Sequence, residues 1–225
     1  MVLIIIPAYN EEGAIGRVLR GLFRHGLTQI NGEITRIIVV DDGSTDATGE
    51  IAKREGAIVL RHSINRGQGA ALETGNEYAR RAGADIVVHF DGDDQFDPAD
   101  IAPAVAKLQQ TNLDAVLGSR FLDSHSKIPA LKRYIILPLA RWINFVFTGV
   151  RLTDAHNGFR VLSRRALEKI VITQNGMAHN SEIIAELKEQ DLRFAEYPVA
   201  VRYFEFGQGL GGGLKVIWDL IINRG

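Results

Sequence analysis

Short runs of β-branched and other apolar residues alternate with longer amphipathic segments, and this alternation constrains the fold more than any other feature. The runs predict buried strands, and the segments between them predict helices. We expect strands at residues 2–6, 34–40, 58–60, 86–90 and 115–118. We expect helices at about 11–24, 46–55, 68–82 and 98–109. The pattern is typical of an α/β fold in which helices flank a Rossmann-like, mainly parallel sheet.

The length of the chain fits one domain with a sizeable core. It has 225 residues, which suits a single large α/β unit better than two unrelated domains. Residues 1–7 lack the basic region and the cleavage site of a signal peptide, so we expect them to form the first buried strand. The sequence offers no stretch of roughly 20 uninterrupted apolar residues, the length that a membrane-spanning helix needs.

The composition excludes several classes of function. The sequence contains no cysteine, which excludes disulfides, thiolate nucleophiles and zinc–cysteine sites and fits a reducing compartment such as the cytoplasm. Any metal must therefore have oxygen or nitrogen ligands. The formal net charge of -1 argues against a globally basic protein, and we expect no nucleic-acid partner.

Polar residues crowd the carboxyl ends of the first four predicted strands. These polar loops cover residues 7–12, 41–46, 65–69 and 91–95. Sheets of this kind bind ligands outside the carboxyl ends of their strands. We therefore expect the four loops to converge on one rim that forms the ligand site.

Asp91 and Asp93 leave the fourth predicted strand with one residue between them. Two carboxylates at this spacing can hold a hard divalent cation, whose open positions the phosphates of a substrate complete. Gln95 can add a carbonyl oxygen. The alternative is a solvated acidic loop that caps the next helix, but the strand context and the other polar loops favour a metal site.

The loops at 41–46 and 65–69 carry weaker signals. Carboxylates of the first can accept hydrogen bonds from a ribose or a base, although turn and N-cap chemistry explains part of this loop. The amides of the second can face an anion at the start of a helix. It matches a dinucleotide fingerprint only partly, because Leu72 replaces the third glycine, and the sequence has no phosphate-loop signature. The incomplete fingerprint disfavours a nicotinamide dehydrogenase. A sugar nucleotidyltransferase is disfavoured because no glycine-rich basic loop follows the first predicted strand.

Five motifs occur in the order found in family 2 glycosyltransferases, and the chain resembles the branch of dolichyl-phosphate mannose synthases and polyprenyl-phosphate glycosyltransferases. The motifs lie at 7–11, 41–46, 65–69, 91–95 and 118–120, and the likeness continues through 154–160 to Arg202. The resemblance implies a single GT-A domain over 1–225. About 1–120 would bind the nucleotide sugar, and about 121–225 would form an acceptor-side extension of helices and strands. It also implies a nucleotide-diphosphate sugar donor, Mg²⁺ or Mn²⁺, and inversion at the anomeric carbon.

The resemblance also assigns the donor side of the site. The family's nucleoside-binding positions match Pro7, Tyr9, Glu11 and Asp42. Its metal ligands match Asp91, Asp93 and Gln95, of which Asp91 would also touch the nucleotide. The family usually has glycine or leucine where Asp94 stands, so an extra charge in this loop would alter the metal preference.

Arginines and one further carboxylate complete the implied site. Arg120 and Arg202 would clamp phosphates, because a planar guanidinium makes bidentate contacts. Asp154 matches the family's acidic residue near the reacting sugar, and the implied catalytic set is Asp154, Asp93 and Arg120. Lys215 is only a loose match to the basic residue expected after Arg202.

Two alternatives for the acceptor stay open. A polyprenyl phosphate is already anionic and needs no strong base, whereas a hydroxyl group must lose its proton to a carboxylate such as Asp154 or Glu182. Residues 129–149 combine apolar bulk with basic residues, which suits a helix in the membrane interface where a lipid acceptor enters. A helix buried on the sheet, or one that pairs subunits of a homo-oligomer, explains the same composition. For residues 214–222 and for His89 we expect core packing.

The leading hypothesis is an inverting, metal-dependent glycosyltransferase that moves a hexose from GDP-mannose or a UDP-sugar to a polyprenyl or dolichyl phosphate. It predicts peripheral contact with the cytoplasmic face of a membrane. One alternative is a glycosyltransferase with a hydroxyl acceptor on a saccharide, protein or small molecule. Another is a non-catalytic module that binds nucleotide sugars, which the intact acidic rim disfavours.

Overall fold

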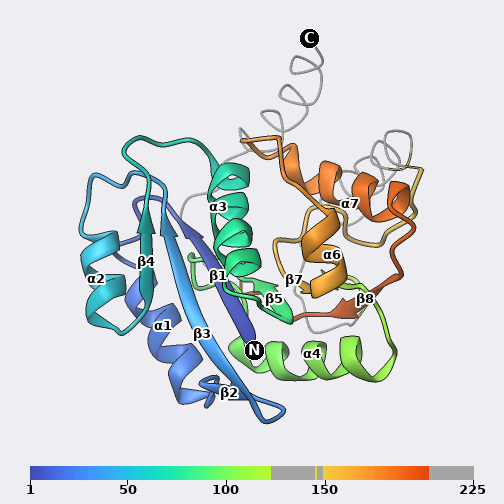
Figure 1. Ribbon diagram of the computed structural model, residues 1–225. Helices are drawn as coiled ribbons and strands as arrows, with labels where there is room; N and C mark the ends of the chain where they lie inside the picture. The colour runs from blue at the N-terminus through green and yellow to red at the C-terminus, as the bar shows by residue number, and fades with distance from the viewer. Residues whose placement is uncertain (123–144, 146–148, 203–225) are drawn as a thin grey trace.

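The computed structural model describes residues 1–122, 145 and 149–202. Its strands form one mixed eight-stranded sheet in the order β2-β3-β1-β5-β7-β6-β8, and β4 also pairs with β3 (Figure 1). The strands are β1 (Val2–Ala8), β2 (Gln29–Ile30), β3 (Glu33–Asp41), β4 (Ile58–Arg61), β5 (Ile86–His89), β6 (Ala115–Ser119), β7 (Arg160–Ser163) and β8 (Phe194–Pro198). All five predicted strands are confirmed.

The predicted helices are confirmed as well, with small differences at their starts. The helices are α1 (Ile15–Arg24), α2 (Thr48–Arg54), α3 (Gln68–Arg81), the short 3₁₀ helix η1 (Pro98–Asp100), α4 (Ile101–Gln110), α6 (Arg164–Lys169) and α7 (His179–Glu189). The first was expected from residue 11, but residues 11–14 form a turn in which Ala14 N donates to Glu11 O at 3.0 Å. The polar loop after β1 therefore extends to the start of α1.

Two halves of different topology share the sheet. β1 lies between β3 and β5 and is parallel to both, as expected for βαβ units. β7 then inserts between β5 and β6 and is antiparallel to both, while β6 and β8 are parallel. Periodicity does not specify strand order, so this mixed sheet could not be predicted. The insertion sets Arg160 opposite His89 and brings the second half of the chain beside the end of β5.

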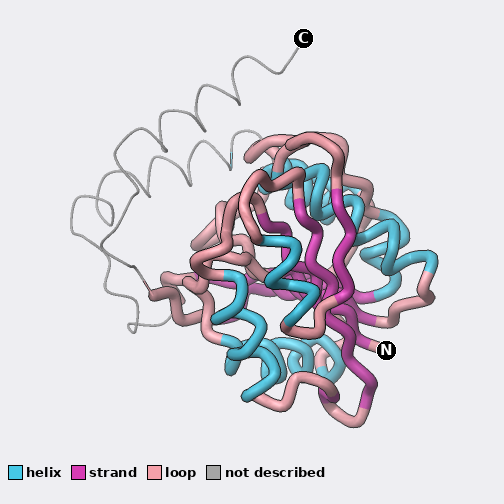
Figure 2. Tube along the Cα trace, turned by 90° about the vertical axis from the view of Figure 1, so that its left-hand side faces the viewer, coloured by secondary structure: helices cyan, strands magenta, loops and turns pink. Residues whose placement is uncertain are grey.

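Helices cover both faces of the sheet (Figures 1 and 2), and an apolar layer lies on each face. Residues of α1, α2 and α4 pack on one face, and residues of α3, α6 and α7 pack on the other. Every residue of β1 is buried, with Ile4 and Ile6 in the first layer and Leu3 and Ile5 in the second. Packing on both faces therefore fixes the position of β1, and the loop after β1 begins from this fixed strand end.

In the part of the chain that the structure describes, no helix combines the length and the apolar character needed to cross a membrane. The segments predicted at 129–149 and 214–222, together with Lys215, lie outside the described residues, except for positions 145 and 149.

α3 packs tightly on β1 at Gly75, where an added Cβ would lie 2.4 Å from Ile5 Cγ2. We predict that Gly75→Ala destabilises the protein by about 1–3 kcal/mol, because overpacking outweighs the gain in helix propensity. Denaturant unfolding measures the change. Gly13→Ala is the control, since a Cβ there meets nothing within 4 Å. Equal stability of the two variants would show that α3 can move away from β1.

Candidate active site

Hydrogen bonds join the loops after β1 and β3 into one rim. Asn10 N donates to Ser44 Oγ at 3.0 Å, and Thr45 N donates to Asn10 Oδ1 at 2.9 Å. Glu11 N donates to Thr48 Oγ1 at 2.8 Å, at the start of α2. The predicted convergence of these strand ends is therefore confirmed.

The predicted nucleoside-binding residues fall into two groups. Tyr9 is 46% exposed at the rim, and Glu11 is half-buried beside it. Pro7 is buried within β1, and Asp42 is only 3% exposed. Only Tyr9 and Glu11 therefore present side chains to the rim.

Asp42 is engaged by its own chain. Its Oδ1 accepts from Arg66 N at 2.9 Å and lies 2.6 Å from His62 Nδ1, while its Oδ2 accepts from Gly67 N at 2.7 Å. A carboxylate that already receives these bonds holds the 62–67 loop against β3. Contact of Asp42 with a nucleoside stays a prediction.

The first turn of α3 is covered, contrary to the expectation that its amides face an anion. Gly69 N donates to Asn175 O at 2.8 Å. A Cβ at Gly69 would lie 1.9 Å from Gln174 O, and one at Gly67 would lie 2.3 Å from Asn175 O. The two glycines therefore admit the 174–175 backbone, a long-range contact that no local motif reveals.

A cluster of three phenylalanine rings packs beside the acidic loop at 91–95, which follows β5. The rings of Phe90 and Phe96 flank the loop in sequence, and their centroids lie 5.8 Å apart. Phe159, from the second half of the chain, lies 6.3 Å from Phe90 and 6.0 Å from Phe96. Asp93 Oδ1 accepts from Gln95 N at 3.0 Å, which folds the loop on itself. This packing fixes the backbone that carries both aspartates.

Three carboxyl groups of the rim resist ionisation. Burial raises the pKa of Asp91 to about 7, with a further contribution from the charge of Asp93, while Arg160 and Arg120 oppose the shift. Burial also raises the pKa of Asp93. The pKa of Glu11 is raised by burial and by the charges of Asp93 and Asp46. A bound cation would relieve this repulsion, so the rim fits a divalent metal ion.

Among the described residues, no group of three or more histidine, aspartate and glutamate side chains is arranged to hold a metal ion by itself. Coordination of a metal ion by Asp91, Asp93 and Gln95 stays a prediction.

Asp94 turns away from this loop. Its φ of 66° lies in the left-handed region, which glycine adopts freely and aspartate tolerates. Its Oδ2 accepts from Arg17 Nε of α1 at 2.9 Å. The charge of Asp94 still contributes to the raised pKa of Asp93, and its effect on the metal preference stays a prediction.

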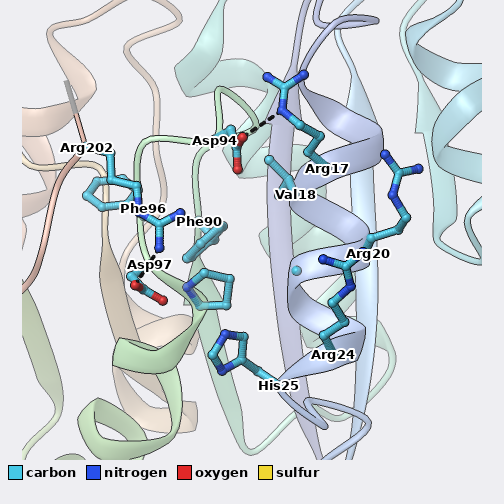
Figure 3. A pocket seen from close by; sticks show the side chains of 12 residues that line it. Arg17, Val18, Arg20, Arg24, His25, Phe90, Asp94, Phe96, Asp97 and Arg202 are labelled. Carbon is cyan, nitrogen blue, oxygen red and sulfur yellow. Dashed lines mark hydrogen bonds and ion pairs between the residues drawn. The ribbon is translucent and has the colours of Figure 1, made fainter. Parts of the chain in front are cut away.

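A groove of about 450 Å³ lies between α1 and the segment from Phe90 to Pro98 (Figure 3). Arg202 extends into it, where Nη2 donates to Asp97 Oδ2 at 2.9 Å. The backbone N of Arg202 donates to Gln95 O at 2.8 Å, which ties β8's continuation to the acidic loop. Arg202 thus lies next to the loop, but its guanidinium pairs with Asp97, and its role as a phosphate clamp stays a prediction.

Arg120 and Asp154 form a bidentate ion pair. Arg120 Nε lies 2.6 Å from Asp154 Oδ2, and Nη2 lies 2.7 Å from Oδ1. Burial opposes ionisation of Asp154, which is 5% exposed, but the hydrogen bonds and charge of Arg120 outweigh it and lower the pKa of Asp154. Glu196 Oε1 accepts from Asp154 N at 3.1 Å and holds this segment in place. A carboxylate with a lowered pKa is a weak base, so this geometry suits orientation of Arg120.

The other carboxylate considered as a base is also engaged. Glu182 accepts hydrogen bonds from Thr173 N and Gln174 N, each at 3.0 Å. It therefore shapes the segment before α7.

Sequence reasoning missed Arg160 as a charged group of this region. It is 2% exposed in β7, and its Nη2 donates to Asn180 Oδ1. Burial lowers its pKa to about 10, although the charges of Asp91 and Asp154 oppose the shift. His89, opposite it, is buried as expected, and Nε2 lies 2.8 Å from Asn76 Oδ1. The sequence did contain a signal for this buried charge, because Arg160 directly precedes the apolar residues of β7.

We predict that Asp91→Asn stabilises the metal-free protein above pH 7. The pKa of Asp91 is about 7 instead of 3.8, so its ionisation between these values costs the folded state free energy. At about 1.4 kcal/mol per pKa unit, the shift corresponds to a gain of about 4 kcal/mol above pH 7, which disappears as the pH falls toward 4. Unfolding in EDTA across this range measures it. If the stability difference between Asp91→Asn and the wild type did not change with pH, the raised pKa of Asp91 would be contradicted.

Comparison with known proteins shows the family. The model of glycosyl transferase family 2 matches residues 3–171. A UDP-N-acetylglucosamine–dolichyl-phosphate N-acetylglucosaminyltransferase from Methanococcus voltae is 31% identical over 251 residues, covering 100% of this chain and 96% of that protein. A dolichyl-phosphate hexose transferase from Haloferax volcanii is 30% identical over 199 residues, covering 88% of this chain and 82% of that protein.

Solved structures agree on the fold. Glucosyl-3-phosphoglycerate synthase from Mycobacterium tuberculosis, in complex with Mn²⁺, uridine diphosphate and glucosyl-3-phosphoglycerate, matches with a TM-score of 0.72 and 20% identity. The match covers 98% of this chain and 78% of that chain. It shows that this chain has an α/β fold of the GT-A type.

Proposed function

The chain belongs to glycosyl transferase family 2 and is a glycosyltransferase, and we propose that it moves a hexose from a nucleotide-diphosphate sugar to a polyprenyl or dolichyl phosphate with inversion. Two relatives similar to it over most of their length carry names that specify dolichyl phosphate as the acceptor. We further propose that it acts at the cytoplasmic face of a membrane, where such an acceptor is accessible.

The donor site of the proposal is the acidic rim. Tyr9 and Glu11 would contact the nucleoside, and Asp91 and Asp93 with Gln95 would hold Mg²⁺ or Mn²⁺. When bound, this ion neutralises negative charge on the departing diphosphate. The mutual repulsion of the rim carboxylates supports this assignment, as does the Mn²⁺ in the complex of the structurally similar synthase.

Arg120 supplies a fixed positive charge near this rim. Its charge opposes the raised pKa of Asp91, so the two groups lie close enough to interact. Asp154 holds the guanidinium through two hydrogen bonds. We propose that Asp154 orients Arg120 toward the phosphate groups of donor or acceptor, because a guanidinium held in advance stabilises developing charge without reorganising.

The observation that carries the choice of acceptor is the engagement of Asp154 by Arg120. A hydroxyl acceptor needs a base to remove its proton, and the lowered pKa of Asp154 makes it a poor one. A phosphate acceptor is anionic at neutral pH and needs no such base. The geometry therefore favours a phosphate over a hydroxyl group as the acceptor, and the names of the two relatives support a lipid phosphate.

We predict transfer of labelled sugar into a lipid fraction. The protein is incubated with Mn²⁺, a polyprenyl phosphate and each of several labelled GDP- and UDP-sugars, and the product is extracted into organic solvent. Label in the organic phase is expected for one donor. It should fall at least 100-fold in Asp93→Asn, because a preorganised charge is removed from the site.

The controls distinguish the acceptors. Omission of the polyprenyl phosphate, or addition of EDTA, should abolish the extractable label. Label that stays in the aqueous phase as a new saccharide or glycoside would contradict the lipid-phosphate proposal and favour a hydroxyl acceptor.

A further inference from the structure

Two contacts from distant parts of the chain hold the side chain of Asp91. Gln68, the first residue of α3, donates from Nε2 to Asp91 Oδ1 at 3.0 Å. On the other side, Gly158 faces the second oxygen, and a Cβ there would lie 2.2 Å from Asp91 Oδ2 and 2.8 Å from Cγ. The carboxylate is therefore confined between an amide donor and a bare backbone.

Gln68 projects from an anchored backbone. The residue before it, Gly67, donates from N to Asp42 Oδ2 at 2.7 Å. The residue after it, Gly69, donates from N to Asn175 O at 2.8 Å. Because both neighbours are bonded to other segments, the start of the Gln68 side chain has little freedom to move away from Asp91.

The backbone at Gly158 is equally fixed. Asn157 Oδ1 accepts from Phe159 N at 2.9 Å, and Asn157 Nδ2 donates to Asp154 Oδ2 at 3.2 Å. The Phe159 ring packs in the aromatic cluster beneath the acidic loop. A side chain at 158 would therefore displace the Asp91 carboxylate, since the backbone cannot retreat.

We propose that Gln68 and Gly158 are positioning residues that hold the Asp91 carboxylate in one orientation, ready to bind a divalent cation. The inference rests on the proposed function, because it takes Asp91 as a metal ligand. An amide nitrogen only donates, so Gln68 restrains one oxygen without competing for the cation. The absence of a side chain at Gly158 leaves the space that the carboxylate occupies in this orientation, because a Cβ there would lie 2.2 Å from Asp91 Oδ2.

Removing a group that orients a metal ligand typically weakens metal binding by about 10–100-fold. This sets the size of the effect that we expect for Gln68. Gln68→Met keeps the length of the side chain and removes the donor. We expect it to weaken binding of Mn²⁺, measured at pH 8 from the EPR signal of the free ion, by about 10-fold or more. Thermal unfolding in EDTA checks that the variant is folded without the metal.

Gln190→Met is the matched control. Gln190 is also partly buried, and its Nε2 donates to Glu186 Oε2 at 3.4 Å at the end of α7. This variant therefore removes a glutamine–carboxylate hydrogen bond outside the proposed site. Its Mn²⁺ affinity should equal that of the wild type. For the second contact, Gly158→Ala should weaken Mn²⁺ binding at least as much as Gln68→Met. Gly176→Ala, where a Cβ meets nothing within 4 Å, should not.

The outcomes separate the two proposals. Wild-type affinity in both Gln68→Met and Gly158→Ala would overturn the positioning role while leaving the metal site intact. Absence of Mn²⁺ binding by the wild type would instead remove the proposed metal site, and the inference with it. If Gly158→Ala does not fold, Gln68→Met still decides the question.

Discussion

The burial of neighbouring carboxyl groups at the carboxyl ends of β1 and β5 is the constraint on which the site depends. Burial raises the pKa of Asp91 and Asp93, and the charge of each neighbouring carboxylate adds to the cost of ionisation. A folded protein tolerates such a cluster only when the surrounding core holds it in place. The fully buried β1 and the three packed phenylalanines provide that support.

The second half of the chain completes the site because β7 inserts beside β5. This strand brings Arg160 next to the acidic loop, and the turn before it brings Gly158 against Asp91. The same segment carries Asp154, which holds Arg120 at the end of β6. The donor-side loops and the charges that balance them thus come from different halves, joined through one sheet.

Local patterns predicted the elements and the acidic loop, because strand periodicity and the spacing of Asp91 and Asp93 are properties of neighbouring residues. Contacts between distant residues could not be predicted in this way. Gln68 lies 23 positions before Asp91, and nothing in its own motif indicates the bond. The sequence predicted that Asp42 contacts the nucleoside and that Asp94 alters the metal preference, and both stay predictions. The structure pairs Asp42 with the 62–67 loop and Asp94 with Arg17.

The most direct test of a metal-dependent donor site is thermal unfolding with GDP, UDP, dTDP, CDP and ADP, each with Mn²⁺ or with EDTA. A ligand that binds only the folded state raises its stability. The account predicts that one nucleoside diphosphate raises the melting temperature when Mn²⁺ is present, and that Asp93→Asn removes this increase. A nucleotide-dependent increase that is the same in EDTA, or that persists in Asp93→Asn, would contradict it.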